Sequence, residues 1–260
     1  MAAVAITVSL PPQSFVFGIR GSRLLGSTVA HTSPFTSMNA VAVTSVARAA
    51  IQALTKNRIN CCILGSTACL IYGMENRVPN DVDIVLLTDD GRSLSTIKEL
   101  IVKANPKFNL IPSSVPSAEH RKLHYQPTSQ SPCKIDIFLP GRDDQFHVPA
   151  IPKARVQHVQ PWGDIPVMPI LPLLLTKLQA WDVYRISKEV RMRARAQRDV
   201  VDLEEMLELA VDHEVNLKLK KEEWLSSQLK FMRGMQNRVE VFVKEYPESR
   251  KQWGRLGFKV

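Results

Sequence analysis

Acidic residues are missing from the first part of this 260-residue chain, because no Asp or Glu precedes Glu75. That composition occurs in organelle transit peptides, but the first ten residues contain no arginine and no amphipathic arginine-bearing helix is evident there. A secretory signal is disfavoured because its charged first region is absent. We expect residues 1–37 to be a disordered or loosely ordered tail, and the protein to be cytoplasmic, with a mitochondrial location as the alternative.

Cysteine is scarce, and long apolar runs are lacking. The four cysteines include the adjacent pair Cys61 and Cys62, and they fit neither a disulfide framework nor paired zinc-ligand spacing. We therefore expect reduced, structural thiols. Prolines interrupt the longest apolar run, near residues 165–175, well short of the roughly 20 residues that span a bilayer. The sequence predicts no association with a membrane.

Acidic residues are also outnumbered along the whole chain, with 25 Asp and Glu against 34 Lys and Arg and a net charge of +9. Such an excess favours acidic partners, such as nucleic acid or nucleotide phosphates. The most basic segment runs from Arg185 to Arg198 and contains only Glu189 as an acidic residue. This segment is either a solvated helix face or a site for the backbone of RNA or tRNA.

Short strand patterns and helical patterns alternate after the tail. Helical spacing of apolar residues predicts helices over 38–56, 93–105, 171–187, 196–213 and 221–244. Period-two alternation predicts strands over 81–87 and 133–139, and two weaker strand signals lie at 108–111 and 123–125. With 45% apolar residues, the chain can bury a core as one or two domains.

Two aspartates alternate with apolar residues in the segment Asp81-Val82-Asp83-Ile84. A strand places alternate side chains on one face, so the two carboxylates are expected to be neighbours. Adjacent anions in a half-buried place are disfavoured unless protons, cations or a metal neutralise them. A divalent ion is the natural explanation.

A glycine-serine turn stands upstream of this strand. Gly65 and Ser66 follow an apolar segment and precede a short helical one, which indicates strand, tight turn and helix. Glycine lets the backbone approach a ligand closely, and free N–H groups in such a turn bind phosphate. The alternative is that Gly65 only makes the turn and Ser66 only caps the helix.

A third carboxylate occurs on a later strand, where Lys134 and Asp136 share one face. Asp136 either joins Asp81 and Asp83 as a metal ligand, or the three carboxylates simply face solvent at a sheet edge. Lys134 pairs with a carboxylate or has a role that the pattern does not define.

In this order and spacing, the motifs resemble those of the DNA polymerase beta-like nucleotidyltransferase superfamily, in particular its AbiEii-type toxins and the minimal nucleotidyltransferases. The likeness runs from about Ile63 to Leu207, and its patterns are Gly65-Ser66 with Asp81-Val82-Asp83, Lys134-Ile135-Asp136, Lys177-Leu178-Gln179-Ala180 with Arg185, and Asp199-Val200-Val201-Asp202-Leu203. The chain departs from the family pattern at Ser66, where a second glycine is commoner. The resemblance implies an α+β fold: a small mixed sheet with flanking helices over 38–168, then a helical region over 169–260.

The resemblance also implies roles for individual residues. The catalytic residues and ligands of Mg²⁺ or Mn²⁺ would be Asp81, Asp83 and Asp136, and the nucleotide-binding residues would be Gly65, Ser66, Arg77 and Lys177. Arg77 and Lys177 are alternatively surface charges. Asp199 and Asp202, three residues apart on a helix, are expected to fix Lys177 or Arg185 rather than to bind metal.

The implied activity is two-metal transfer of an NMP from an NTP, such as ATP, to a hydroxyl of RNA, protein or a small molecule. Two other functions compete with it. The chain is alternatively a catalytically inactive nucleotidyltransferase-like binding module, or a basic RNA-binding protein in which the Asp-x-Asp motif is incidental.

Overall fold

The computed structural model describes residues 39–87, 91–112, 121–126, 131–141, 146–213 and 223–260. All of these residues belong to one compact unit. The N-terminal tail expected over residues 1–37 lies outside the described residues. The expected boundary between residues 168 and 169 stays a prediction.

A five-stranded mixed sheet forms the centre of the unit. Its strands in chain order are β1 (Cys61–Leu64), β2 (Asp81–Leu86), β3 (Phe108–Ile111), β4 (Lys122–Tyr125) and β5 (Cys133–Phe138). They lie side by side in the order β1-β2-β5-β4-β3. Only β2 and β5 run parallel, and the other neighbouring pairs are antiparallel. The fold class expected from the sequence, an α+β protein with a small mixed sheet, is confirmed.

Period-two alternation gives the central strands one apolar and one polar face. Val82 and Ile84 of β2 are fully buried, and Ile135 of β5 is 1% exposed. Asp81 and Asp83 of β2 and Asp136 of β5 alternate with these apolar residues and therefore lie on the opposite face, where they are only partly buried. Apolar contact with the helices on one face thus fixes which face presents the carboxylates.

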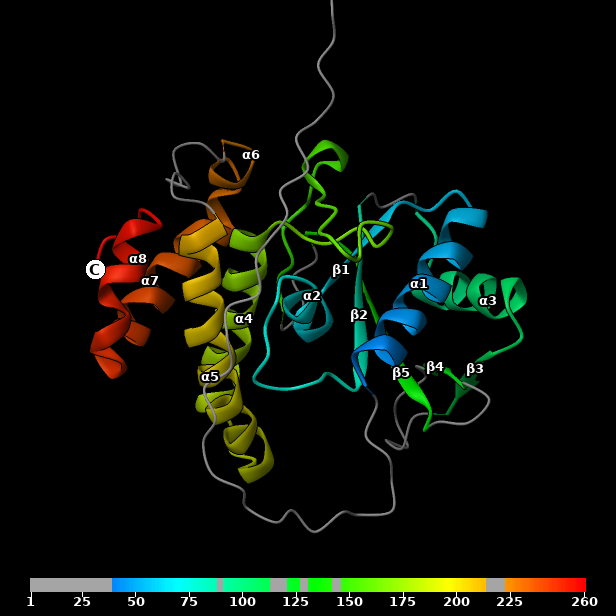
Figure 1. The fold of residues 1–260 in the computed structure, drawn as a ribbon, viewed down its shortest axis with the longest axis horizontal. Helices are drawn as coiled ribbons and strands as arrows, with labels where there is room; N and C mark the ends of the chain where they lie inside the picture. The colour runs from blue at the N-terminus through cyan, green and yellow to red at the C-terminus, as the bar shows by residue number, and fades with distance from the viewer. Residues whose placement is uncertain (1–38, 88–90, 113–120, 127–130, 142–145, 214–222) are drawn as a thin grey trace, which may run out of the picture. The chain divides into compact units, whose positions relative to one another are not determined.

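Helices surround the sheet. α1 (Ala40–Lys56) packs against β1 and β2, and α3 (Leu94–Ala104) packs against α1 and β3. The short α2 (Gly65–Ile71) contacts β1, β2 and the later helix α4 (Ile170–Arg185), and Figure 1 shows it between the sheet and α4. The Ser93 hydroxyl accepts a hydrogen bond from the Thr96 N–H and caps the N-terminus of α3.

The C-terminal part of the unit is helical. After α4 come α5 (Val190–His213), α6 (Glu223–Ser226), α7 (Leu229–Glu245) and α8 (Arg250–Arg255), with 3₁₀ turns at Lys153–Arg155 and Pro247–Ser249. α4 and α5 pack side by side (Figure 1). Trp181 of α4 meets Phe242 of α7 edge to face, with ring centroids 4.9 Å apart. This aromatic contact fixes α7 against the inner helices.

Two helix boundaries differ from the expectation. α5 begins at Val190 rather than at 196, because the arginine-rich first turns extend a helix whose apolar period starts later. The helix expected over residues 221–244 is divided into α6 and α7. The division has a tertiary cause: the Gln228 side chain accepts from the Ala150 N–H at 2.9 Å and donates to the Ala150 carbonyl at 3.0 Å.

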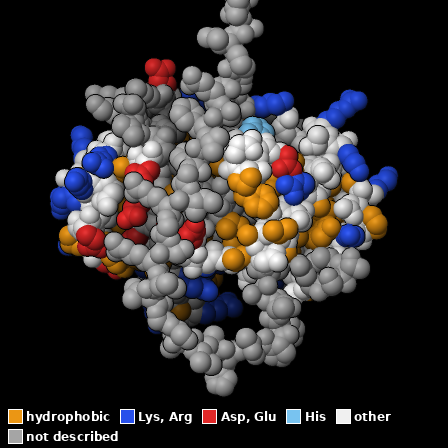
Figure 2. All heavy atoms as spheres, in the orientation of Figure 1, with side chains coloured by type: hydrophobic (Ala, Val, Ile, Leu, Met, Phe, Trp, Pro, Cys, Tyr) orange, Lys and Arg blue, Asp and Glu red, His pale blue; other side chains and the backbone are white. Residues whose placement is uncertain are grey.

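The surface carries dispersed positive charge. Figure 2 shows lysine and arginine side chains spread around the margins of this face, with apolar side chains gathered between them. The four cysteines are free and buried, as expected for structural thiols. Within the described ranges, no helix combines the length and the apolar character needed to cross a membrane.

Candidate active site

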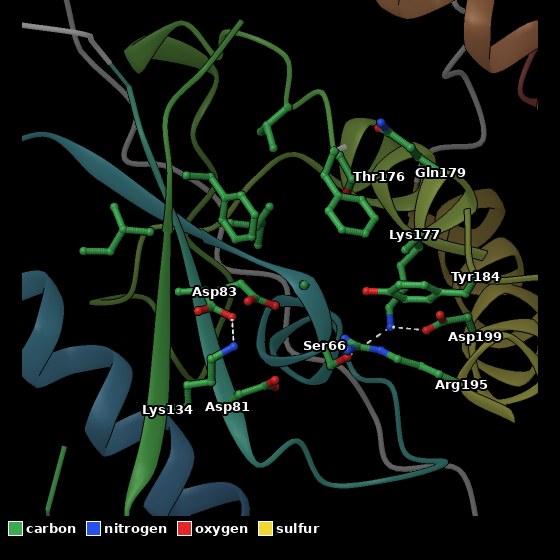
Figure 3. Close-up of a pocket in the computed structure, with 18 of the residues that line it drawn as sticks. Ser66, Asp81, Asp83, Lys134, Thr176, Lys177, Gln179, Tyr184, Arg195 and Asp199 are labelled. Atoms are coloured by element: carbon green, nitrogen blue, oxygen red, sulfur yellow. Dashed lines mark hydrogen bonds and ion pairs between the residues drawn. The ribbon is translucent and has the colours of Figure 1, made fainter. Parts of the chain in front are cut away.

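A cavity of about 420 Å³ lies between the sheet and the helices. Its sheet wall is formed by Asp81 and Asp83 of β2 and by Lys134 and Asp136 of β5. Its helix wall is formed by residues of α2, α4 and α5: Ser66, Thr176, Lys177, Gln179, Ala180, Tyr184, Arg195 and Asp199. Figure 3 shows side chains of both walls converging on the space between them. Phe138, Phe146 and Val148 add an apolar lining.

The sheet wall is built by strand register. Asp83 of β2 pairs with Asp136 of β5, and Asp81 pairs with Lys134. Residues paired in register project to the same side of a sheet, so all three carboxylates face the cavity. The ammonium group of Lys134 forms an ion pair with the Asp136 carboxylate. Lys134 thus pairs with one of the three anions, while Lys98 also lines the cavity and the charge of Lys177 acts on Asp83 from the helix wall.

The crowding of like charge shows in the protonation of Asp83. Burial, followed by the neighbouring charges of Asp81 and Asp136, raises the pKa of Asp83 to about 7. A carboxyl group with that pKa carries its proton about half the time at neutral pH. The sheet wall is therefore short of positive charge.

Gly65 is placed where no other residue fits easily. Its φ is +67°, and a Cβ added to it would overlap the Asp83 carboxylate, 2.9 Å from Cγ. Glycine is favoured in that backbone region because it lacks a Cβ. A glycine is therefore required at this position by the fold itself, with or without a ligand, because it lets α2 begin directly against Asp83.

The helix wall is a network of paired charges. Lys177 is 6% exposed, and its Nζ lies 3.4 Å from Asp199 and forms a shorter ion pair with Asp202. It also donates to the Ser66 hydroxyl at 3.0 Å. Lys177 is therefore a buried group that two aspartates hold, as the sequence led us to expect.

Arg77 lies behind this wall rather than in the cavity lining. Its guanidinium group binds Asp202 through two hydrogen bonds, at 2.6 and 3.0 Å, and donates to Ser66 at 2.6 Å. Burial raises the pKa of Asp202, but the hydrogen bond from Arg77 and the charge of Lys177 outweigh it and hold that pKa below its usual value. Because the Ser66 oxygen accepts from Arg77 and Lys177, its own proton remains to be donated into the cavity.

Sequence reasoning did not assign Tyr184 and Arg195 to the site. Both line the cavity, and the Arg195 guanidinium lies 4.8 Å from the centroid of the Tyr184 ring. Tyr184 follows Lys177 by seven residues, and Arg195 precedes Asp199 by four, so each shares a helix face with a residue of the motif. This helical spacing is the feature of the sequence from which Tyr184 and Arg195 could have been assigned to the site. Arg185, by contrast, binds Asp182 at 2.8 Å and stacks on Trp181.

The sheet wall fits a divalent cation in its chemistry. Carboxylate oxygens are hard ligands, and three of them lie together on this wall, where burial and the charges of Asp81 and Asp136 raise the pKa of Asp83. In the part of the chain that the structure describes, no three His, Cys, Asp or Glu side chains are arranged as a finished metal centre. Lys134 pairs with Oδ2 of Asp136 and so competes with an ion for that oxygen.

The mixed sheet and the cavity that it lines define a nucleotidyltransferase-like fold. Residues 64–254 match the family model described as nucleotidyl transferase AbiEii toxin, type IV toxin–antitoxin system. This match spans most of the chain, and the protein belongs to the AbiEii nucleotidyltransferase family. Membership makes NMP transfer the general chemistry of the class. A search of curated proteins found no significant match.

Solved structures extend the likeness in fold. An antigenic nucleotidyltransferase-like protein from Paracoccidioides brasiliensis is 17% identical, with a TM-score of 0.55 over 85% of this chain and 94% of that one. The antibiotic-resistance factor ANT(2″)-Ia is 11% identical, with a TM-score of 0.38 over 68% of this chain and 94% of its own. JHP933 from Helicobacter pylori is 14% identical, with a TM-score of 0.34 over 82% and 97% of the two chains. The first of these supports the fold.

Proposed function

We propose that the protein is a Mg²⁺-dependent nucleotidyltransferase that moves an NMP from an NTP to a hydroxyl group of an acceptor. The observation that carries this proposal is the cavity itself. Three carboxylates on adjacent strands face a serine hydroxyl and a buried lysine that is held in place by two aspartates. Oxygen ligands on one side and phosphate-binding groups on the other are what such a transfer needs.

Asp81, Asp83 and Asp136 would hold the divalent ion. When bound there, Mg²⁺ supplies polarisation of the α-phosphate and a lower pKa for the attacking hydroxyl. The acceptor oxygen bonds to the α-phosphorus, the bond from that phosphorus to the bridging oxygen breaks, and pyrophosphate leaves. The acceptor hydroxyl gives its proton to water as its bond to phosphorus forms.

The helix wall serves the phosphates in this proposal. Ser66 has a proton to donate to a phosphate oxygen, and Lys177 offsets the charge that grows on the leaving pyrophosphate. Arg77 acts indirectly, because its contacts fix Ser66 and Asp202. Gly65 keeps the start of α2 close to Asp83.

RNA or tRNA is a candidate acceptor, through the basic run Arg185 to Arg198. Part of that run is already engaged: Arg191 pairs with Glu189 at 2.6 Å, and Arg193 donates to the carbonyls of Ser187 and Lys188. The cations left for RNA are therefore fewer than the run suggests. The family description mentions a toxin of a toxin–antitoxin system, and the RNA of a host cell is a reasonable acceptor to test first.

An inactive binding module is the second candidate, and one observation favours it. Lys134 neutralises Asp136, as a cation would in a protein that has lost its metal. In that case the protein would bind nucleotide without transferring any part of it.

Labelled NTPs distinguish the two candidates. The protein is incubated with Mg²⁺ or Mn²⁺, a mixed RNA and protein extract, and each NTP labelled on either its α- or its γ-phosphate. Nucleotidyl transfer moves the α-label and not the γ-label to the acceptor, and Asp81→Ala and Asp83→Ala abolish it. Asp212→Asn, at an exposed carboxylate outside the cavity, is the matched control. Absence of α-label transfer with every NTP, or transfer that survives Asp81→Ala, contradicts the enzymatic proposal.

A further inference from the structure

Two side chains of α5, Arg195 and Asp199, stand one helical turn apart on the helix wall of the cavity. Residues at this spacing are neighbours on a helix surface, and an arginine and an aspartate there ordinarily pair with each other. No hydrogen bond or ion pair between them is present among the described residues, although the charge of Arg195 acts on the Asp199 carboxylate at longer range. Each therefore retains an unused interaction in the cavity.

Arg195 differs from those arginines of its run that bind carboxylate or carbonyl oxygens. Arg185 and Arg191 pair with carboxylates, and Arg193 donates to two backbone carbonyls. Within the described residues, the Arg195 guanidinium makes a cation–π contact with the Tyr184 ring and a longer-range charge interaction with Asp199, and it forms no ion pair. That contact holds the guanidinium in place and leaves its N–H groups to an anion. In Figure 3 the Arg195 side chain reaches towards Ser66 and Lys177.

Among the described residues, Asp199 has an acceptor oxygen without a donor, whereas Arg195 has donors without an acceptor. Asp199 is 4% exposed, and its Oδ1 faces Lys177 at 3.4 Å. Its Oδ2 is buried and has no hydrogen-bond partner among the described residues. A buried carboxylate oxygen without a donor is costly, and native structures rarely leave one unless a ligand or water completes it.

We propose that Arg195 and Asp199 are a nucleotide-reading pair, in which Arg195 binds a phosphate of the NTP and Asp199 Oδ2 accepts a hydrogen bond from a hydroxyl of its ribose. The inference rests on the proposed function, because it assigns ribonucleotides as the substrate class of the same cavity. The pair occupies neighbouring positions, about 5–6 Å apart between Cβ atoms. One ligand that carries an anionic group and a hydroxyl donor a few bonds apart can satisfy both.

The ribose contact is tested first on the unaltered protein. Calorimetry in Mg²⁺ buffer measures binding of each of the four ribonucleoside triphosphates, their 2′-deoxy and 3′-deoxy forms, and inorganic tripolyphosphate. Loss of the ribose hydroxyl that donates to Asp199 weakens binding about tenfold or more, since the buried Oδ2 is again left without a donor. Equal affinity for the ribose form and both deoxy forms overturns the assignment of Asp199.

Matched variants separate the two contacts. Arg195→Gln weakens binding of both NTP and tripolyphosphate about tenfold, because each carries the phosphate that Arg195 holds. Arg198→Gln, in the same run but outside the cavity lining, leaves both affinities unchanged. Equal effects of these two variants overturn the assignment of Arg195 and indicate charge attraction alone.

Asp199→Asn keeps an oxygen for Lys177 but turns an amide nitrogen, which cannot accept, towards the ligand. It removes the preference for ribose over deoxyribose and retains the affinity for tripolyphosphate. A variant that loses both affinities together reports damage to the helix wall and contradicts the ribose contact. The affinity for tripolyphosphate therefore serves as the internal test of folding.

The outcome for the pair is independent of the outcome for catalysis. Sugar-dependent binding without transfer of any α-label supports the reading pair and overturns the proposed enzyme. Transfer of α-label with no sugar preference and no effect of Arg195→Gln supports the enzyme and overturns the reading pair.

Discussion

The sheet wall and the helix wall of the cavity hold similar charged groups in opposite states. At the helix wall, Lys177 from the cavity lining and Arg77 from behind it both pair with the buried Asp202, so this carboxylate is neutralised within the protein. On the sheet wall, three half-buried carboxylates face the cavity, and among the described residues only Asp136 has an ion pair, with Lys134. The comparison shows that folding pairs Asp202 with two cations, whereas Asp81 and Asp83 have no ion pair among the described residues.

Substitutions should therefore have opposite consequences on the two walls. Removing a charge from the helix wall leaves its buried partner without a counter-charge and lowers the stability of the fold. Removing a carboxylate charge from the sheet wall should relieve repulsion and cost the proposed function instead.

The largest expected effect on stability is that of Lys177→Met. This change leaves Asp199 and Asp202 buried without their shared cation, and we expect the free energy of unfolding to fall by about 3–5 kcal/mol. Urea denaturation followed by circular dichroism measures it. Lys251→Met, at an exposed lysine, should change stability little. Similar losses of stability in the two variants would show that the ion pairs of Lys177 with Asp199 and Asp202 do not stabilise the fold.

Gly65→Ala tests how closely the two walls meet. The added methyl group overlaps the Asp83 carboxylate, and the residue keeps a positive φ, so we expect a loss of about 2–3 kcal/mol. Gly141→Ala is the control, because its φ of +72° is similar while nothing lies within 4 Å of the added Cβ. The difference between the variants isolates the clash with Asp83, and equal losses would exclude it.

Asp83→Asn tests the repulsion on the sheet wall. Because the folded pKa of Asp83 is about 7, against 3.8 for the unperturbed group, the native state keeps a proton that the unfolded state releases between about pH 4 and pH 7. Stability of the unaltered protein falls as pH rises through that window, and the penalty is complete above pH 7. In EDTA at pH 8, Asp83→Asn should be more stable by about 2 kcal/mol.

The advantage of Asp83→Asn should shrink as the pH is lowered towards 4. Urea denaturation at several pH values gives the profile. Addition of Mg²⁺ at pH 8 should raise the stability of the unaltered protein more than that of the variant. A pH-independent difference between the two proteins would contradict the raised pKa.

Lys134→Met has the smallest expected effect. Removal of the ammonium group releases Asp136 and takes away a competing cation, so Mn²⁺ should bind a few-fold more tightly, which corresponds to about 1 kcal/mol. Titration followed by electron paramagnetic resonance measures the free ion. Lys107→Met, at an exposed lysine next to β3, should leave the affinity unchanged. Weaker binding by Lys134→Met would show that Lys134 helps to build the metal site.

Local patterns were sufficient to predict the strands and much of the site. Alternation along the chain predicted that Asp81 and Asp83 share a face, and the same rule placed Asp136. Their common cavity depends on β2 and β5 being neighbours, which the family resemblance implied and no local pattern determines. The aspartates, Gly65, Ser66 and Lys177 all line one cavity. Their catalytic and binding roles stay proposals.

Long-range packing explains what the sequence did not reveal. Arg77 and Asp202 are 125 residues apart, so nothing local indicates that they bind each other. Arg195 looked like one member of a surface run, because only the packing of α5 on α4 brings it to Tyr184. The division between α6 and α7 likewise depends on Ala150, far away in the chain.

Binding of Mn²⁺ to the metal-free protein tests most directly whether the sheet wall awaits a cation. We predict that the unaltered protein and Asp212→Asn bind the ion equally, and that Asp81→Asn, Asp83→Asn and Asp136→Asn each lose at least tenfold in affinity while remaining folded. Equal Mn²⁺ affinity in all five proteins would show that the three carboxylates do not form the metal site.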